Sequence, residues 1–217
     1  LLISVPFLII TMLVYCLIPE LRDLHGKSLV CYVLCFTVAY IFLAAVQLGG
    51  EAFDQDLCVV VAFVIQFSFL SCFSWLNVLS FNTWWNMEAH VTLQQHSEES
   101  SQNHYRGYMI SKNNEVNMPK GNERRFFIFF SIYAWGCPLV ILFVSMGVDL
   151  MPIIPSSYLK PNFGDNKCWF SSEEAELPYF YGPVAISIAI NTVLFIFTAC
   201  KVYCHGRRAL RHKPRQM

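Results

Sequence analysis

Charge is scarce in this sequence. Only 14% of its 217 residues are Asp, Glu, Lys or Arg, whereas soluble domains carry about 25%. It also has no Asn-x-Ser/Thr acceptor for N-glycosylation, and none of its six histidines lies inside a long apolar run. The low charge excludes an ordinary soluble domain. The missing acceptor means that glycosylation gives no information about which segments face the cell exterior.

Long apolar runs account for most of the chain. Five stretches contain no Asp, Glu, Lys, Arg or His, and these are 1–18, 28–50, 59–87, 126–148 and 177–200. A helix needs about 20 apolar residues to cross a hydrocarbon core of roughly 30 Å, and backbone groups in lipid must pair within the helix. We therefore predict an all-α membrane protein with five transmembrane helices. Because the chain starts inside an apolar run and ends in a basic segment, we expect a bundle truncated at both ends.

The segments between these runs differ sharply in basic residues. Thirteen of the fifteen Lys and Arg lie in the first, third and fifth connecting segments, which are 19–27, 88–125 and 201–217. Only Lys160 and Lys167 lie in the second and fourth segments, 51–58 and 149–176. Lys and Arg are retained in the cytoplasm during membrane insertion. The first, third and fifth segments are therefore predicted to be cytoplasmic in a multi-pass plasma-membrane protein, and the polar middle of 88–125 is predicted to be disordered.

This orientation leaves two cysteines on the oxidising side of the membrane. Seven of the nine cysteines lie in predicted helices or at their cytoplasmic ends, and only Cys58 and Cys168 lie in extracellular segments. Disulfides persist outside the cell, so we predict one bridge from Cys58, at the start of the third helix, to Cys168. The alternative is two free exterior thiols.

Small polar residues recur at every third position of the third apolar run. They are Ser68, Ser71, Ser74, Asn77, Ser80 and Thr83. A step of three residues winds around a helix of 3.6 residues per turn, and polar groups prefer partners in other helices to lipid. The third helix is therefore predicted to be the central one, with a polar-lined pore as the alternative.

A few other side chains inside or near the predicted helices need partners. Gln66 and Asn191 are predicted to make hydrogen bonds between helices, and ligand contact is the alternative. Trp169 beside the predicted bridge either caps a ligand cavity or packs over the bridge. Cys31 and Cys35 lie one helical turn apart, but no second pair completes a metal site, so we expect packed thiols and neither metal nor cofactor.

Four motifs occur in order along the chain. They are "RDLHGKSLVCYVL" at 22–34, "YAWGCP" at 133–138, "KCWF" at 167–170 and "YFYGPVAISIAIN" at 179–191. Together they resemble the transmembrane region of secretin-like and adhesion-like G-protein-coupled receptors, and most of all the Methuselah-like receptors of insects. The resemblance implies structural-motif roles for His25, Trp135, Gly136, Pro138, Gly182 and Pro183. It departs at "SFNTWWN", where the family has His-Glu, and at 88–125, a long segment that is either a regulatory insertion or retained non-coding sequence.

The resemblance implies a receptor that relays an extracellular ligand, of peptide or protein class, to a cytoplasmic G protein. Its basic inner face would consist of Arg22, Lys27, Arg124, Arg125, Arg207 and Arg208, which can also contact anionic lipid. Because the family's sixth and seventh helices are missing from these 217 residues, we expect the fragment alone to be inactive. A transporter or channel subunit is the alternative, although no predicted helix carries the ionisable residues that such proteins usually need. No catalytic constellation lies at membrane depth, so we expect neither an enzyme nor a nucleic-acid partner.

Overall fold

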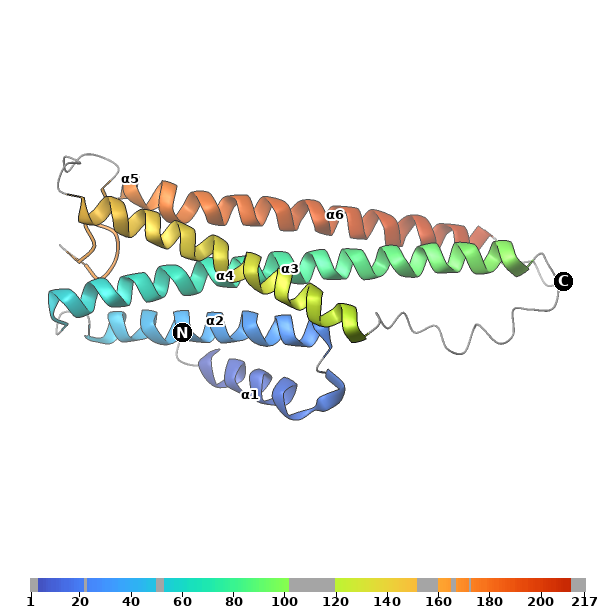
Figure 1. Ribbon diagram of the computed structural model, residues 1–217, viewed down its shortest axis with the longest axis horizontal. Coiled ribbons are helices and arrows are strands. Elements are labelled where there is room, and N and C mark those ends of the chain that lie inside the picture. Colours follow the sequence, from blue (N-terminus) through green and yellow to red (C-terminus); the bar gives the residue numbers. More distant parts are fainter. Residues whose placement is uncertain are drawn as a thin grey trace.

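The computed structural model describes residues 4–21, 23–49, 53–101, 120–151, 160–164, 167–171 and 173–211, with side chains described except at 20, 88–101, 120–122, 206 and 208–211. In chain order the elements are α1 (Ser4–Leu17), η1 (Pro19–Leu21), α2 (Leu24–Gly49), α3 (Gln55–Ser101), α4 (Lys120–Leu150), α5 (Glu173–Glu176), the π turn η3 (Leu177–Tyr181) and α6 (Gly182–Arg211). Every regular element of the described residues is helical, as the sequence predicts. The long helices run side by side along one axis (Figure 1).

Among the described residues, four stretches are long and apolar enough to cross a membrane. They are Leu24–Gly49, Gln55–Met87, Glu123–Leu150 and Glu173–His205. The first predicted helix, at 1–18, corresponds to α1, whose described part has 14 residues, fewer than the roughly 20 that cross a bilayer. Of the five predicted transmembrane helices, four thus have the length of a membrane span within the described residues, and the described part of α1 is a shorter apolar helix.

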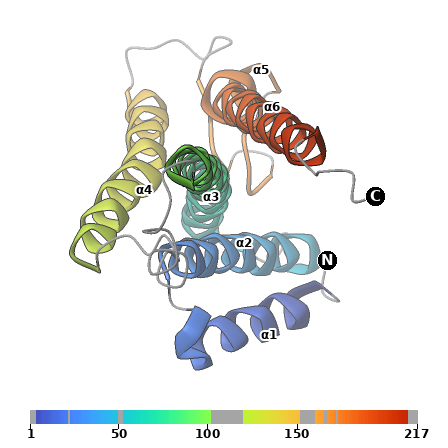
Figure 2. The ribbon, with the colours of Figure 1, turned by 90° about the vertical axis from the view of Figure 1, so that its right-hand side faces the viewer.

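α3 is the central helix, as its polar positions predict. It packs against α2, α4 and α6, and Figure 2 shows it between them. In the most apolar stretch of each helix, 56% of the residues of α3 are buried, against 28% in α2, 11% in α4 and none in α6. Of the six polar positions, Ser68, Ser71, Ser74 and Asn77 are buried, Ser80 is half-buried and Thr83 is exposed. The four buried groups therefore face protein and not lipid.

α3 also continues beyond the predicted end of the apolar run. Its 47 residues extend about 70 Å at 1.5 Å per residue, more than twice the thickness of a hydrocarbon core. Residues 88–101, which the sequence assigns to a loop, are helical because Glu, Ala, Leu and Gln favour helix even where apolar periodicity stops. The segment predicted to be disordered is 96–122. Residues 96–101 belong to α3 and residues 120–122 to α4, so both of its ends are helical, and 102–119 lies outside the described residues.

The turn from α1 into α2 explains the glycine of the first motif. The backbone N–H of Gly26 donates to Oδ1 of Asp23 at 2.6 Å, so Asp23 caps the first turn of α2. A Cβ at Gly26 would overlap the carbonyl oxygen of Leu21, and only glycine fits there. His25, in the same turn, is half-buried.

Candidate functional site

Cys58 and Cys168 are joined by a disulfide, as predicted. The bridge links positions 110 residues apart, with their Cα atoms 4.6 Å from each other, and both residues are buried. Cys58 lies in the first turn of α3, where its N–H donates to the carbonyl of Asp54 at 2.9 Å. Cys168 lies in the segment 160–171, which we call the disulfide segment. The bridge therefore ties this segment to the start of the central helix.

The disulfide segment folds back over that end of the bundle. The N–H of Ser171 donates to the carbonyl of Pro161 at 3.0 Å and closes the turn. Gly164 has a φ of 83°, and a Cβ there would lie 2.9 Å from Cγ2 of Val59 on α3. Both the left-handed backbone and the close approach to α3 require glycine at this position.

Aromatic rings fill the space between the disulfide segment and the helices. The ring centroid of Phe163 lies 4.5 Å from that of Phe170 and 4.7 Å from that of Phe63 on α3. Phe170 in turn stacks on Tyr179 of η3 at 6.5 Å. Phe163, Phe170 and Tyr179 are buried, so the disulfide segment, α3 and η3 share one aromatic core.

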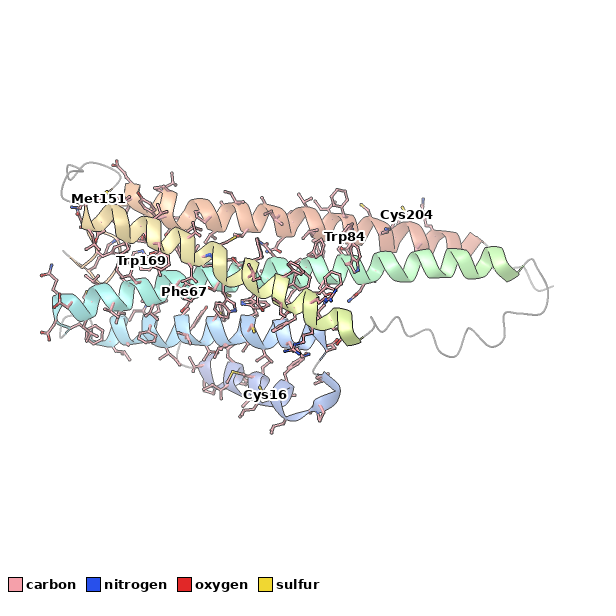
Figure 3. All side chains as sticks on the ribbon, in the orientation of Figure 1. Cys16, Phe67, Trp84, Met151, Trp169 and Cys204 are labelled. Carbon is pink, nitrogen blue, oxygen red and sulfur yellow. A yellow bond between two sulfur atoms is a disulfide. The ribbon has the colours of Figure 1, made fainter. Side chains whose placement is uncertain are left out.

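Trp169 connects the disulfide segment to both ends of η3. Its indole N–H donates to the carboxylate of Glu176, which immediately precedes η3. Its ring lies 5.1 Å from Phe180 within η3 and 5.1 Å from Phe170, and Figure 3 shows it at this end of the bundle. Glu176 is buried, which is costly for a carboxylate, and the indole hydrogen bond offsets part of that cost. Trp169 is thus part of a packed cluster.

Gln66 joins three elements through its buried amide. Its Nε2 donates to the carbonyl of Tyr179 at 3.2 Å, and its Oε1 accepts from the hydroxyl of Ser145 on α4 at 3.3 Å. Pro183 has no N–H and so cannot donate to the carbonyl four residues earlier, which is that of Tyr179. Gln66 therefore supplies a donor from α3 to a carbonyl that the proline leaves without its usual partner.

η3 widens the helix immediately before α6. The N–H of Gly182 donates to the carbonyl of Leu177, five residues earlier, and a Cβ at Gly182 would lie only 2.9 Å from that oxygen. π turns are rare and are frequent at functional sites. The two motif residues Gly182 and Pro183 thus lie together at the junction between η3 and α6.

The α4 motif packs against the middle of α3. The ring of Trp135 lies 5.8 Å from Phe67 and 5.9 Å from Trp75, centroid to centroid. Pro138 is buried inside α4. At Gly136 no described atom outside the adjacent residues and the local helix backbone lies within 4 Å of the position that a Cβ would take, so crowding does not explain that glycine.

Asn191 lacks the predicted partner. Its side-chain nitrogen and oxygen are both buried and have no hydrogen-bond partner among the described residues, and the same holds for Nδ2 of Asn82 on α3. Polar groups inside a membrane bundle normally find partners on neighbouring helices. The predicted hydrogen bond from Asn191 to another helix is therefore not found among the described residues.

The start of α2, the start of α4 and the end of α6, which carry the described members of the predicted basic face, lie away from the end with the disulfide segment (Figure 1). Those whose side chains are described are exposed, and they are Lys27, Arg124, Arg125 and Arg207. The guanidinium carbon of Arg207 lies 5.0 Å from the ring centroid of Tyr203. Arg22 and the side chain of Arg208 lie outside the described residues.

Two partners in this site have no role in the sequence-based predictions. Glu176 follows the exposed Glu173 and Glu174, and no local pattern distinguishes the buried carboxylate from its neighbours. Ser145 is one of several small polar residues in apolar runs. For Tyr179, the sequence does contain a signal. A proline inside a helix leaves the carbonyl four residues earlier without a donor, so Pro183 predicts that the carbonyl of Tyr179 needs a partner from another element.

Comparison with known proteins gives consistent matches. Residues 1–216 match the family described as 7 transmembrane receptor (Secretin family). The chain is 36% identical over 210 residues to the G-protein coupled receptor Mth2 of Drosophila yakuba, which covers 96% of the chain and 34% of that receptor. It is 35% identical over 210 residues to the probable G-protein coupled receptor Mth-like 10 of Drosophila melanogaster, covering 96% and 32%. The chain spans about a third of the length of the curated relatives that it matches.

Proposed function

The chain belongs to the secretin family of seven-transmembrane receptors, and we propose that, within a longer protein, it relays an extracellular ligand signal to a cytoplasmic heterotrimeric G protein. It is part of the transmembrane region of a multi-pass membrane receptor and is similar to Methuselah-type receptors. A peptide or protein is the proposed ligand class.

The proposed orientation places the disulfide end outside the cell. Two observations support it. The bridge between Cys58 and Cys168 needs an oxidising compartment to persist, and the exposed Lys27, Arg124, Arg125 and Arg207 lie at the opposite end. A disulfide outside and basic residues inside are consistent with a single insertion of the bundle into the plasma membrane.

The signalling proposal rests on the contacts that link Trp169 of the disulfide segment, through η3, to Gln66 of the central helix. Gln66 donates to the carbonyl of Tyr179. Trp169 contacts residues before and after Tyr179, because its indole N–H donates to Glu176 and its ring packs on Phe180. A ligand that moves the disulfide segment would therefore change the forces on the π turn. Relaxation of a π turn by one residue would rotate α6 by about 100°.

Such a ligand shifts the receptor only by the difference between its affinities for the two arrangements of η3. The rotation would turn the far end of α6, where Arg207 lies. At this end α3 and α6 extend beyond the thickness of a bilayer. We propose this end as the surface that the G protein contacts.

The chain alone is proposed to be inactive. The matching family has seven transmembrane helices, and none of the residues in the most apolar stretch of α6 is buried, which supports further helices beside α6 in the longer receptor. Without those helices the surface at the basic end is incomplete.

The test compares G-protein nucleotide exchange in membranes that contain either residues 1–217 or the longer receptor. We expect exchange above the level of untransfected membranes only for the longer receptor, and a changed basal rate in its Gln66→Leu variant. Gln47→Leu, the same substitution at an exposed position of α2, is the control and should leave the rate unchanged. Absence of exchange for the longer receptor, or solute flux through the reconstituted protein, would overturn the proposal.

A further inference from the structure

A pocket opens between α1, α2 and α4 near the end of the bundle that carries the basic residues. Its volume is about 320 Å³, and it is lined by Tyr15, Cys16, Gly26, Lys27, Val30, Cys31 and Phe127. Figure 3 labels Cys16 on α1, the helix that forms one wall. Ligand pockets in proteins measure about 300–1,000 Å³, so this one accommodates part of a single acyl chain and not a whole lipid.

The lining is apolar apart from one charge. Val30, Cys31 and Phe127 provide carbon and sulfur surface, whereas Lys27 is exposed and forms no ion pair with any described carboxylate. Arg124 is exposed and lies three residues before Phe127, on the same face of α4, whereas Arg125 lies two residues before Phe127 on the opposite face. The pocket thus combines an apolar wall with a lysine at its rim.

Two acidic residues also occur at this end of the bundle. Asp23 already accepts the hydrogen bond from Gly26 that caps α2, and Glu123 lies in the first turn of α4. Of the charged side chains at this end, only Lys27 lines the pocket, whereas Asp23, Glu123 and Arg124 lie outside the lining. An anionic head group is therefore complementary to the one charge of the lining.

The pocket lies away from α6. It is lined by α1, α2 and α4, whereas the most apolar stretch of α6 has no buried residue among those described. Viewed along the helices, α6 and the α1–α2 pair lie on different sides of α3 (Figure 2). A further helix that covers α6 would leave the pocket open to the bilayer.

We propose that this pocket is a binding site for an anionic glycerophospholipid of the leaflet at the basic end. The acyl chain would occupy the wall formed by Val30, Cys31 and Phe127, and the phosphate would lie against Lys27 with Arg124 beside it. Basic pockets between transmembrane helices are suited to such head groups because the phosphate is neutralised where the acyl chain is buried. The site requires neither ligand binding at the disulfide end nor coupling to a G protein.

Native mass spectrometry of the purified 217-residue chain in detergent tests the proposal, with phosphatidylserine and phosphatidylcholine of identical acyl chains as probes. We expect tighter binding of phosphatidylserine. Lys27→Gln should weaken phosphatidylserine binding about fivefold and leave phosphatidylcholine binding unchanged, since one Lys near a membrane surface contributes roughly 1 kcal/mol. Lys27→Arg should retain the preference, and Lys167→Gln, the same charge change at the disulfide end, should have no effect.

A second pair of variants tests the apolar wall. Val30→Phe fills the pocket and should reduce binding of both lipids, whereas Leu34→Phe, one turn along α2 and outside the lining, should not. Equal binding of the two lipids, equal effects of Lys27→Gln and Lys167→Gln, or full binding by a folded Val30→Phe variant would overturn the proposal. Displacement of phosphatidylserine by cholesterol would also overturn the proposal, because the occupant would then be a sterol. Loss of lipid binding in the longer receptor would overturn it too, because another helix would then fill the pocket. If the lipid-binding results are as expected but the longer receptor does not promote nucleotide exchange on a G protein, only the proposed signalling function is overturned.

Discussion

The side-chain nitrogen of Gln66 lies 3.2 Å from the carbonyl oxygen of Tyr179, a hydrogen bond between residues 113 positions apart in the sequence. It supports the one carbonyl that Pro183 deprives of its usual helical donor. A leucine at position 66 would keep most of the volume and remove this bond. We expect Gln66→Leu to destabilise the folded chain by about 1 kcal/mol, measured by thermal unfolding in detergent, whereas the exposed Gln47→Leu should have no such effect. Equal melting temperatures for Gln66→Leu and the native chain would show that this bond contributes no stability.

The bond between Trp169 and Glu176 permits a double-mutant test. Trp169→Phe keeps a ring against Phe170 and Phe180 but leaves the buried carboxylate without its indole donor. We expect this change to cost about 1–3 kcal/mol of unfolding free energy. Glu176→Gln removes the buried charge, so Trp169→Phe should cost less in that background. Additive costs in the two backgrounds would mean that the two side chains are not coupled.

The disulfide should be the strongest single constraint at its end of the bundle. Replacing both Cys58 and Cys168 by alanine should lower the stability of the folded chain by about 2–4 kcal/mol, because the bridge joins residues 110 positions apart. Cys137→Ala, which changes an exposed thiol that forms no disulfide, is the matched control. Mild reduction should reproduce the effect in the native chain but not in the double alanine variant. A native chain whose stability is unaffected by reduction would contradict this prediction.

The stability of the chain should respond differently to a methyl group at Gly26 and at Gly147. At Gly26 a Cβ would overlap the backbone oxygen of Leu21, so Gly26→Ala must displace the turn between α1 and α2 and should cost about 1–3 kcal/mol. At Gly147 no described atom lies within 4 Å of that position, and Gly147→Ala in the interior of α4 should be neutral or stabilising because alanine favours helix. The measurement is thermal unfolding of both variants. Equal effects would argue against the close approach at Gly26.

The transmembrane helices and the disulfide could be predicted because each is determined by one or two physical constraints that can be seen in the sequence. A long run without charge has no stable alternative to a helix in lipid, and the distribution of Lys and Arg leaves Cys58 and Cys168 as the pair of thiols on one side. The central place of α3 followed from polar groups on all sides of a single helix, which only neighbouring helices can satisfy. These predictions needed composition and spacing and no knowledge of packing.

The contacts within the site could not be predicted in the same way. Trp169 meets Glu176, and Gln66 meets Tyr179, because the disulfide segment folds onto η3, and that arrangement depends on packing between segments distant in sequence. The end of α3 was also misplaced, since loss of apolar residues after Met87 marks the end of the membrane span but not of the helix, which continues to Ser101. Helix propensity, and not hydropathy, decides where such a helix ends.

The orientation of the bundle is the premise on which the receptor mechanism depends, and two exposed lysines at opposite ends test it. Lys167 lies in the disulfide segment and Lys27 lies at the start of α2. Intact cells that express the chain can be treated with an amine-reactive reagent that does not cross membranes, and the modified peptides identified by mass spectrometry before and after permeabilisation. We predict that Lys167 is modified in intact cells and that Lys27 is modified only after permeabilisation. Modification of Lys27 in intact cells, with Lys167 protected until permeabilisation, would contradict the proposed orientation and the signalling direction that follows from it.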